Sequence, residues 1–149
     1  MLPSRGFGVV CLLAAPLLVL CGCAIQPGSG LTASQARVQF YSVLDNTQEA
    51  VGQQTWEVLD DPTARGCVIP LWLEGEQFPG FRIGPAPRDP QALANKVFAT
   101  WTSWGYKVDR SRVADAIELQ GRNSLGELVI FRVSGKGMTL QGESECRPA

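Results

Sequence analysis

The sequence predicts an α+β fold, with a mainly antiparallel sheet, two helices packed on one face and one disulfide. Three observations lead to this prediction. Two stretches before Gly105 carry apolar residues at helical spacing, and after Gly105 the chain changes to the period-two alternation of strands. Two cysteines are also left to form a disulfide once an amino-terminal secretory segment is removed.

Residues 1–22 have the pattern of a lipoprotein signal peptide. Arg5 precedes an apolar run over residues 6–20 that contains no charged residue and is too short to cross a bilayer comfortably. The run leads into LCGC ending at Cys23, which resembles the bacterial lipobox, where the cysteine thiol is diacylglycerated and the preceding peptide bond is cleaved. We therefore expect Cys23 to be the first mature residue and to carry lipid, including palmitate. The alternatives are a signal peptide cut elsewhere and a retained membrane anchor.

Residues 23–32 are expected to be the lipidated cysteine and a flexible tether. The stretch AIQPGSG has no periodic apolar face, and as a coil it reaches only about 15 Å. Residues 33–149 then form a single α+β domain of ordinary size. The short tether implies that this domain lies close to the membrane surface.

Charge and composition exclude several classes of function. Without residues 1–22 the chain keeps 12 basic and all 14 acidic residues, and this formal charge of −2 gives no reason to expect nucleic acid as a partner. Histidine is absent, which removes the commonest general base and the usual metal ligand. The GxSxG, SxxK, Walker and dinucleotide-binding motifs are also absent. We therefore expect no cofactor, no metal and no enzymatic activity.

The expected processing reduces five cysteines to two. Cys11 and Cys21 leave with the signal peptide, and Cys23 is acylated. Cys67 and Cys146 remain outside the membrane, where thiols are usually oxidised, so we expect them to form a disulfide. Closing a loop of about 79 residues contributes roughly 4 to 5 kcal/mol in the chain-entropy model. A reactive thiol pair is the alternative, but the sequence has no CxxC spacing that favours one.

Two amphipathic helices are predicted. The first begins after an N-cap at Thr32 or Ser34 and ends near Gly52, and the second begins after Asp89 as N-cap and ends at Gly105. Apolar residues at helical spacing predict which side chains are buried. They are Ala33, Ala36, Phe40, Val43, Leu44, Thr47 and Val51 in the first helix, and Leu93, Ala94, Val97, Phe98, Trp101 and Trp104 in the second.

Seven strands are predicted from β-branched and aromatic content, alternation and turn signals. They cover residues 54–59, 67–76, 78–83, 106–113, 116–122, 127–133 and 138–146. Pro70 cannot donate a ladder hydrogen bond, so its strand is expected at an edge or with a bulge. Residues 128–131 are apolar on both faces of their predicted strand, which favours a central position in the sheet. In their predicted strands, Cys67 lies on the same face as Ile69, and Cys146 on the same face as Leu140. Both sulfur atoms are therefore expected on the core side of the sheet.

Four short stretches together resemble a known family. QTWEVLDDP, GCVIP, WGYKV and GMTLQGESEC resemble corresponding elements of the mycobacterial and actinobacterial LppA-type lipoproteins. The resemblance extends over roughly residues 54–146, which is most of the mature domain. It implies a lipid anchor at Cys23 and a bridge between Cys67 and Cys146. It implies no catalytic residue, because no activity is established for that family.

An aromatic segment is the candidate recognition patch. Trp72, Phe78 and Phe81 lie around two glycines, and Trp72 has the parity opposite to that of Cys67. If the outer face of the sheet is uncovered, Trp72 is exposed. An exposed aromatic residue beside a Pro- and Gly-rich loop favours recognition of a partner. Burial beneath that loop is the alternative.

Acidic residues supply the candidate catalytic groups. Two pairs with a spacing of two lie in predicted strands, Glu74 with Glu76 and Glu143 with Glu145. Each pair could share a face, as the paired carboxylates of a glycosidase do, although solvent-facing glutamates are the commoner explanation. Asp60 and Asp61 lack the alternating ligand spacing of a calcium loop, so we expect them to cap a turn.

These observations favour a cell-envelope lipoprotein, anchored by lipid at the outer face of the cytoplasmic membrane. Its domain is expected to be a non-enzymatic binding or accessory module whose partner is an envelope protein or a cell-wall ligand. The alternative is a carboxylate-dependent hydrolase that acts on cell-wall material.

The first prediction concerns anchoring. We expect Cys23→Ser to prevent both lipid modification and signal cleavage, because both steps need the cysteine thiol. Mass spectrometry of the wild-type amino terminus should show an acylated cysteine, and the variant should keep residues 1–22. Wild-type mature chains that begin at another residue and carry no lipid would contradict this.

Overall fold

The computed structural model describes residues 29–52, 55–71 and 73–149. The predicted signal peptide, Cys23 and Trp72 lie outside the described residues. The elements are α1 (Ala33–Val51), β1 (Glu57–Val58), β2 (Arg65–Ile69), β3 (Leu73–Gln77), β4 (Pro79–Gly84), α2 (Pro90–Ser103), β5 (Lys107–Val113), β6 (Ala116–Arg122), β7 (Leu128–Ser134) and β8 (Gly137–Glu143).

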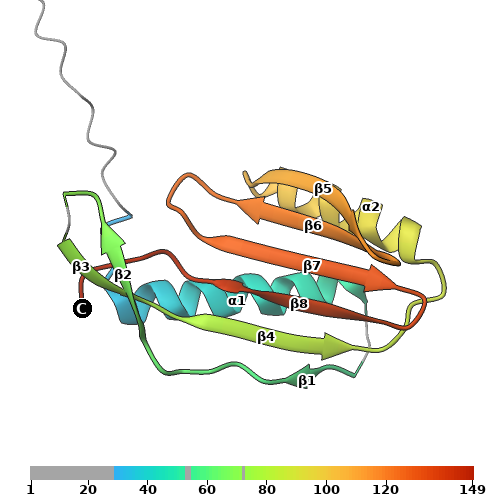
Figure 1. Ribbon diagram of the computed structural model, residues 1–149, viewed down its shortest axis with the longest axis horizontal. Helices are drawn as coiled ribbons and strands as arrows, with labels where there is room; N and C mark the ends of the chain where they lie inside the picture. The colour runs from blue at the N-terminus through green and yellow to red at the C-terminus, as the bar shows by residue number, and fades with distance from the viewer. Residues whose placement is uncertain (1–28, 53–54, 72) are drawn as a thin grey trace, which may run out of the picture.

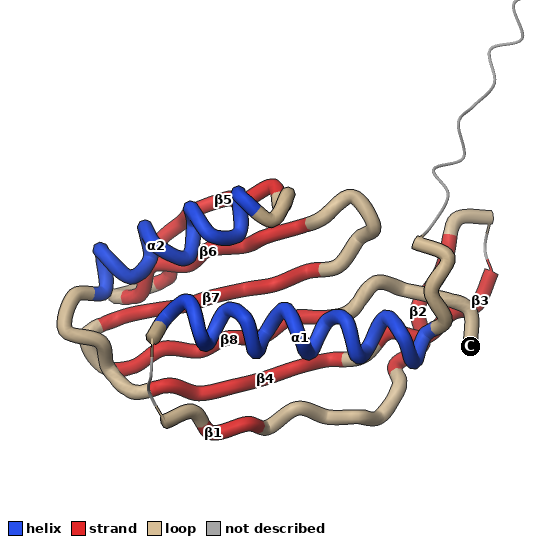
Figure 2. The backbone as a smooth tube through the Cα atoms, turned by 180° about the vertical axis from the view of Figure 1, so that it is seen from behind, coloured by secondary structure: helices blue, strands red, loops and turns tan. Residues whose placement is uncertain are grey.

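The main sheet has six antiparallel strands in the order β1-β4-β8-β7-β6-β5. Both helices lie on the same face of this sheet, as Figures 1 and 2 show from opposite sides. Strands β2 and β3 form a separate two-stranded hairpin at one end of the sheet. The predicted α+β class, with two helices on one face of a mainly antiparallel sheet, is confirmed.

The helix boundaries follow the predicted caps. Thr32 accepts a hydrogen bond from the backbone of Gln35, whose side chain accepts one from the Thr32 backbone, so α1 begins with a capping box. It ends at Gly52, whose φ of 118° suits glycine. Asp89 caps α2 through Ala92 as predicted. The C-cap of α2 is Trp104 rather than Gly105, and Gly105 follows it with a φ of 89°.

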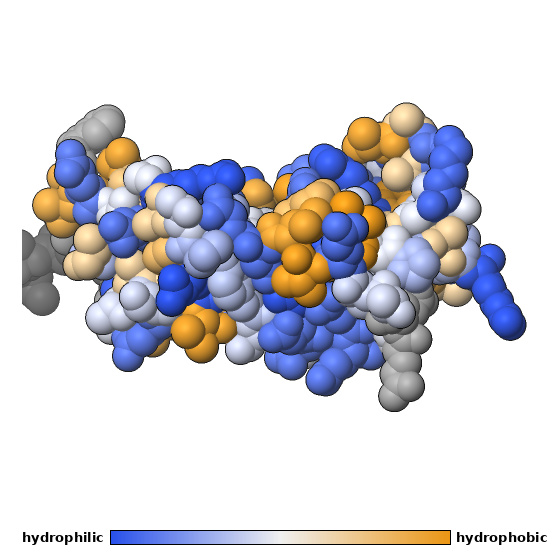
Figure 3. Space-filling view, turned by 90° about the horizontal axis from the view of Figure 1, so that it is seen from below, coloured by the Kyte–Doolittle hydropathy of each residue, from blue (hydrophilic) through white to orange (hydrophobic). Residues whose placement is uncertain are grey.

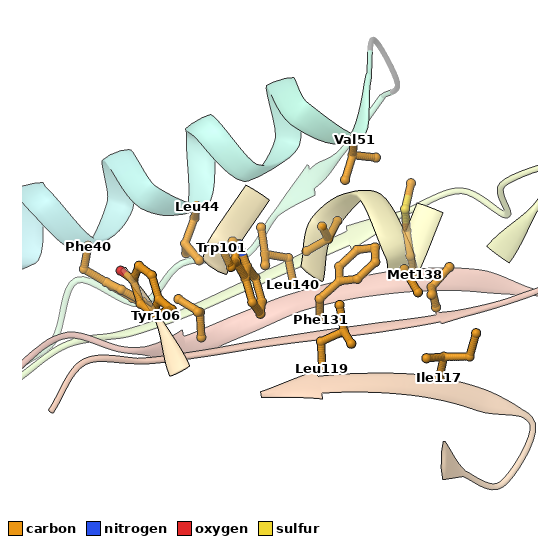
Figure 4. Close-up of a cluster of buried hydrophobic side chains, with 14 residues drawn as sticks. Phe40, Leu44, Val51, Trp101, Tyr106, Ile117, Leu119, Phe131, Met138 and Leu140 are labelled. Atoms are coloured by element: carbon orange, nitrogen blue, oxygen red, sulfur yellow. The ribbon is translucent and has the colours of Figure 1, made fainter. Parts of the chain in front are cut away.

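The core is a single cluster between the helices and the sheet (Figure 4). Trp101 of α2 lies at its centre, fully buried, and its indole N–H donates to the Thr47 hydroxyl of α1 at 3.0 Å. The other labelled side chains come from both layers: Phe40, Leu44 and Val51 from α1, Tyr106 after α2, and Ile117, Leu119, Phe131, Met138 and Leu140 from the sheet. Phe98 and Trp104 were expected in this core but are 36% and 41% exposed, because they lie at the margin of the apolar face of α2.

Two glycines allow the helices to approach the sheet closely. A Cβ on Gly80 of β4 would lie 2.5 Å from Leu44 Cδ1 of α1, and a Cβ on Gly121 of β6 would lie 3.0 Å from Trp101 Cε3 of α2. Both distances are shorter than a normal carbon–carbon contact. The two helices therefore pack directly on the backbone of the sheet at these points.

Strand β7 has the predicted central position, between β8 and β6. Val129, Phe131 and Val133 face the helices and are buried, whereas Leu128 and Ile130 face the other way and are half-buried. Apolar residues on both faces therefore mark a central strand here, but among the residues that the structure describes no second layer covers its outer face.

The amino-terminal strands differ most from the prediction. The expected strand over residues 54–59 is only the two-residue β1, and the expected strand over 67–76 is the β2–β3 hairpin, with Pro70 in its turn. Leu71, also in the turn, has a φ of 75°, which is uncommon for a residue other than glycine. The turn reverses the chain, but Cys67, Ile69 and Leu73 still share one face as predicted, because Cys67 pairs with Gly75 and Ile69 pairs with Leu73.

The predicted disulfide between Cys67 and Cys146 is present, with a Cα–Cα distance of 6.0 Å. The expectation that both sulfur atoms face the main core was wrong. Both cysteines are half-buried, and the Cys146 sulfur lies beside Gly75 and Ile69 of the hairpin. The disulfide therefore joins the hairpin to the segment after β8, outside the main core.

We expect Cys67→Ser to lower the free energy of unfolding by about 2 to 5 kcal/mol, because it releases a long loop in the unfolded chain. Replacing both cysteines should cost little more than replacing one, since the two act as a unit. Denaturant unfolding without reductant measures both effects. Thiol titration of folded wild-type protein should detect neither residue, and two reactive thiols would disprove the bridge.

Candidate functional site

Within the described residues, no helix covers the face of the sheet opposite α1 and α2 (Figures 1 and 2), and we call it the open face. Its outward residues are Phe81 and Ile83 on β4, Thr139, Gln141 and Glu143 on β8, Leu128, Ile130 and Arg132 on β7, and Glu118 and Gln120 on β6. Figure 3 views the molecule along its β1 edge, where the upper margin is hollowed between two raised ends.

Two adjoining hollows occupy the open face. The larger, of about 540 Å³, extends from Phe81 to the β7–β8 turn, and the smaller, of about 340 Å³, extends from Phe81 toward Arg65. Phe81 and Gln141 line both hollows. Because these two residues are cross-strand partners, they form the ridge between the hollows.

The middle of the open face is uncharged, with apolar side chains next to neutral amides. A cross-strand row runs through Phe81, Gln141, Ile130 and Gln120 on four neighbouring strands. The charged residues lie toward its edges in pairs: Glu118 with Arg132, Asp115 with Lys136, and Glu143 with Arg65. An apolar centre with a polar rim is the usual arrangement of a protein interface.

Glu118 is the most buried charged residue on this face, at 4% exposure. Gln120 donates to its Oε1 at 2.7 Å, and Arg132 donates to its Oε2. These hydrogen bonds, that of Gln120 first, hold the pKa of Glu118 below its ordinary value although burial acts to raise it. Glu118 is thus a fixed anion that orients Arg132 at the rim.

The predicted aromatic patch does not form as one surface. Phe78 is 4% exposed, and the Arg37 guanidinium lies 5.0 Å from its ring centroid, so Phe78 belongs to the interior. Phe81 is half-buried on the open face. Trp72 lies outside the described residues. Of the three candidates, Phe81 is the one that the structure places on a hollowed surface.

The candidate catalytic glutamates lie in different surroundings. Glu74 and Glu76 line one shallow groove of about 430 Å³, side by side on β3. Glu143 is on the open face, hydrogen-bonded by Gln77 at 3.1 Å. Glu145 is buried, accepts a hydrogen bond from Ser29 and lies 3.7 Å from Arg147. The two members of the second pair are therefore in separate environments.

Asp60 and Asp61 have different roles. Asp61 accepts a hydrogen bond from the Thr63 backbone at 2.9 Å, which lowers its pKa and confirms the predicted turn cap. Asp60 instead binds Arg82, with Oδ2 2.8 Å from a guanidinium nitrogen, and accepts from the Phe81 backbone at 3.0 Å. Within residues 29–52, 55–71 and 73–149, no group of three or more Cys, Asp or Glu is placed to hold a metal ion.

Arg82 is the best-buried cation of the described chain, at 3% exposure. Burial disfavours its charge, but Asp60, Asp45 and the hydrogen bonds that they accept raise the pKa of Arg82 above its ordinary value. The Asp45 contact is 2.5 Å and reaches across from α1. Arg82 points away from the open face and binds β4 to the helix layer.

Tyr106 and Glu127 form a buried pair that the sequence did not reveal. Glu127 begins the predicted strand over residues 127–133, yet it is 2% exposed and accepts a hydrogen bond from the Tyr106 hydroxyl. Burial is the main cause that raises the pKa of Glu127, and nearby Glu145 adds to it. Burial and the bond to Glu127 also raise the pKa of Tyr106.

The end of the sheet that carries the β2–β3 hairpin also holds both ends of the described chain (Figures 1 and 2), and we call it the hairpin end. Arg147 exchanges two backbone hydrogen bonds with Glu76 of β3, at 2.7 and 3.0 Å. Its side chain donates to the Leu31 carbonyl at 2.8 Å. The start of the described chain and the hairpin are therefore bound to the same segment.

Comparison with known proteins supports the fold alone. No protein family and no curated protein matches the sequence. The fold is similar to the crystal structure of a DUF4853 family protein from Actinomyces odontolyticus ATCC 17982, with a TM-score of 0.62 and 17% sequence identity over 83% of this chain and 73% of that chain. In the described part of the chain, no helix is long and apolar enough to cross a membrane.

The pH dependence of stability gives a test of the buried pair. Because the folded-state pKa of Glu127 is raised above 4.5, its contribution to stability is present below pH 4.5 and is lost as the pH rises through the folded pKa. Glu127→Gln keeps an acceptor for Tyr106 but cannot ionise. We expect its melting temperature to fall less than that of the wild type between pH 4.5 and 7, as measured by thermal unfolding.

The exposed Glu57→Gln serves as the control, and it should keep the wild-type slope. Equal slopes for Glu127→Gln and the wild type would show that Glu127 ionises as easily in the folded state as in the unfolded chain.

Proposed function

We propose that this protein is a cell-envelope lipoprotein of the outer face of the cytoplasmic membrane, whose domain binds another envelope protein through the open face. The lipid anchor at Cys23 is inferred from the lipobox pattern that ends the apolar run. The binding role is supported by one structural observation. This is the pair of hollows that meet at Phe81 and Gln141 on the face of the sheet opposite the helices.

The chemistry of the open face favours a protein partner. Its centre offers half-buried apolar side chains, such as Ile130 and Phe81, beside the neutral amides of Gln141 and Gln120. Its rim offers charges of both signs, which suits a complementary protein surface better than a polyanion.

The alternative function, a hydrolase of cell-wall material, needs two carboxylates that face one another across one cleft. Glu74 and Glu76 stand beside each other on a single strand, and Glu145 is already paired with Ser29 and Arg147. The groove beside Glu74 is otherwise lined by small and apolar residues. The geometry therefore supports a binding role better than a hydrolytic one.

Site-specific photocrosslinking in intact cells tests the binding role. We expect a photoreactive amino acid at Gln141 to form a discrete protein adduct, because Gln141 lines both hollows. The same amino acid at Gln91, exposed on α2 of the opposite layer, is the matched control and should not form that adduct. Adding Ile130→Glu should remove the Gln141 adduct, since it places a charge in the apolar centre.

Adducts of the same size and yield from Gln141 and Gln91 would refute a role for the open face. An adduct with glycan rather than protein would show that the partner is a cell-wall glycan and would overturn the proposal of a protein partner.

A further inference from the structure

The tip of the β2–β3 hairpin is the most exposed group of large apolar side chains in the described chain. Leu71 is 72% exposed, Val68 65% and Leu73 57%. Leu73 pairs with Ile69 next to the turn, and Val68 pairs with Glu74 one step further away, so Val68 and Leu73 extend from opposite faces of the hairpin close to its tip. Exposed apolar groups gathered at one projecting point usually mark a contact with a partner or a membrane.

The hairpin is held rigidly to the domain. The Cys67–Cys146 disulfide joins β2 to the segment after β8, and two backbone hydrogen bonds join Glu76 of β3 to Arg147 of that segment. A Cβ on Gly75 would lie 2.9 Å from the Cys146 sulfur, so the hairpin packs closely on the disulfide. The tip is therefore presented in a fixed direction.

The position of the tip relative to the expected lipid decides which partner it fits. The described chain begins at Ser29, and Leu31 is bound to Arg147, which is bound to the hairpin. Five residues lie between Cys23 and Ser29 in the sequence, so the six steps from Cys23 to Ser29 span about 22 Å at most when fully extended. A lipid on Cys23 therefore keeps the hairpin end within that distance of the bilayer.

We infer that the hairpin tip is a second membrane contact, which seats Val68, Leu71 and Leu73 at the boundary between the headgroups and the acyl chains beside the lipid anchor. This inference rests on the proposed lipidation of Cys23. Glu74 follows the tip directly and is exposed, so the contact is shallow, roughly 5 Å deep. Apolar burial drives it, and anionic lipid is not required.

This contact fixes the orientation of the domain relative to the membrane. The acyl groups already hold the protein at the membrane, so the tip adds a second point that stops the domain from rotating freely about its tether. Strands β4 and β8 run between the hairpin end and the opposite end of the sheet (Figure 1). Seating the tip therefore leaves the open face accessible beside the membrane rather than pressed against it.

Photoactivatable phosphatidylcholine tests this contact. The mature lipidated protein is reconstituted in phosphatidylcholine vesicles and irradiated, and lipid adducts are mapped by mass spectrometry. We expect adducts on the peptide that carries Leu71 and Leu73, and about tenfold fewer of them in Leu71→Asp/Leu73→Asp, because the carboxylates resist transfer from water. Aspartate tolerates the positive φ of residue 71, so the turn is preserved.

Val113→Asp is the matched control. Val113 is 46% exposed next to the β5–β6 turn, at the opposite end of the sheet, and its substitution should leave the adducts on the tip unchanged. Thiol titration of every variant verifies that the Cys67–Cys146 disulfide has formed. Leu71→Asn provides a single change in case the double variant does not fold, and it should also lower the yield.

The outcomes separate the two proposals. A lipidated amino terminus without adducts on the tip overturns the membrane contact and leaves the anchor in place. An amino terminus without lipid, found by the same mass spectrometry, overturns the anchor itself. Adducts spread equally over the tip and the Val113 peptide would also overturn the inference, because they would show an unoriented domain.

Discussion

The fold depends on the burial of Trp101 between two helices and one face of the sheet. Its ring is fully buried against Gly121, and its N–H donates to Thr47, so one side chain joins α2, α1 and β6. Both helices lie on the same face of the sheet, and together they cover this large aromatic ring (Figure 2). In the described part of the chain, the opposite face of the sheet carries no helix (Figures 1 and 2).

The buried charges follow from this one-sided arrangement. Arg82 points into the helix layer and is neutralised by Asp45 from α1 and Asp60 from the loop before β2, whereas Glu118 points to the open face and is neutralised by Arg132. Each ion is costly to bury alone and tolerable when paired. The first group binds β4 to the helices, and the second gives the open face an ordered, charged rim.

Attachment and binding are assigned to different parts of the domain. The hairpin end gathers the start of the described chain, the disulfide and the carboxyl-terminal segment, through contacts of Arg147 with Leu31 and Glu76. The smaller hollow, which reaches Arg65, lies nearer this end, and the larger hollow extends to the β7–β8 turn at the other end. A domain held at the hairpin end can therefore present its open face without moving its membrane contact.

The sequence by itself determined the two capped helices, the strands after Gly105, the central position of β7 and the Cys67–Cys146 pair, because helical periodicity, caps, alternation and the cysteine count are local signals. Tertiary structure alone decided that Pro70 reverses the chain, that Phe78 faces inward while Phe81 faces the open hollows, and that Glu127 is buried. Alternation shows that a strand has two faces, but which face is covered depends on where two distant helices pack.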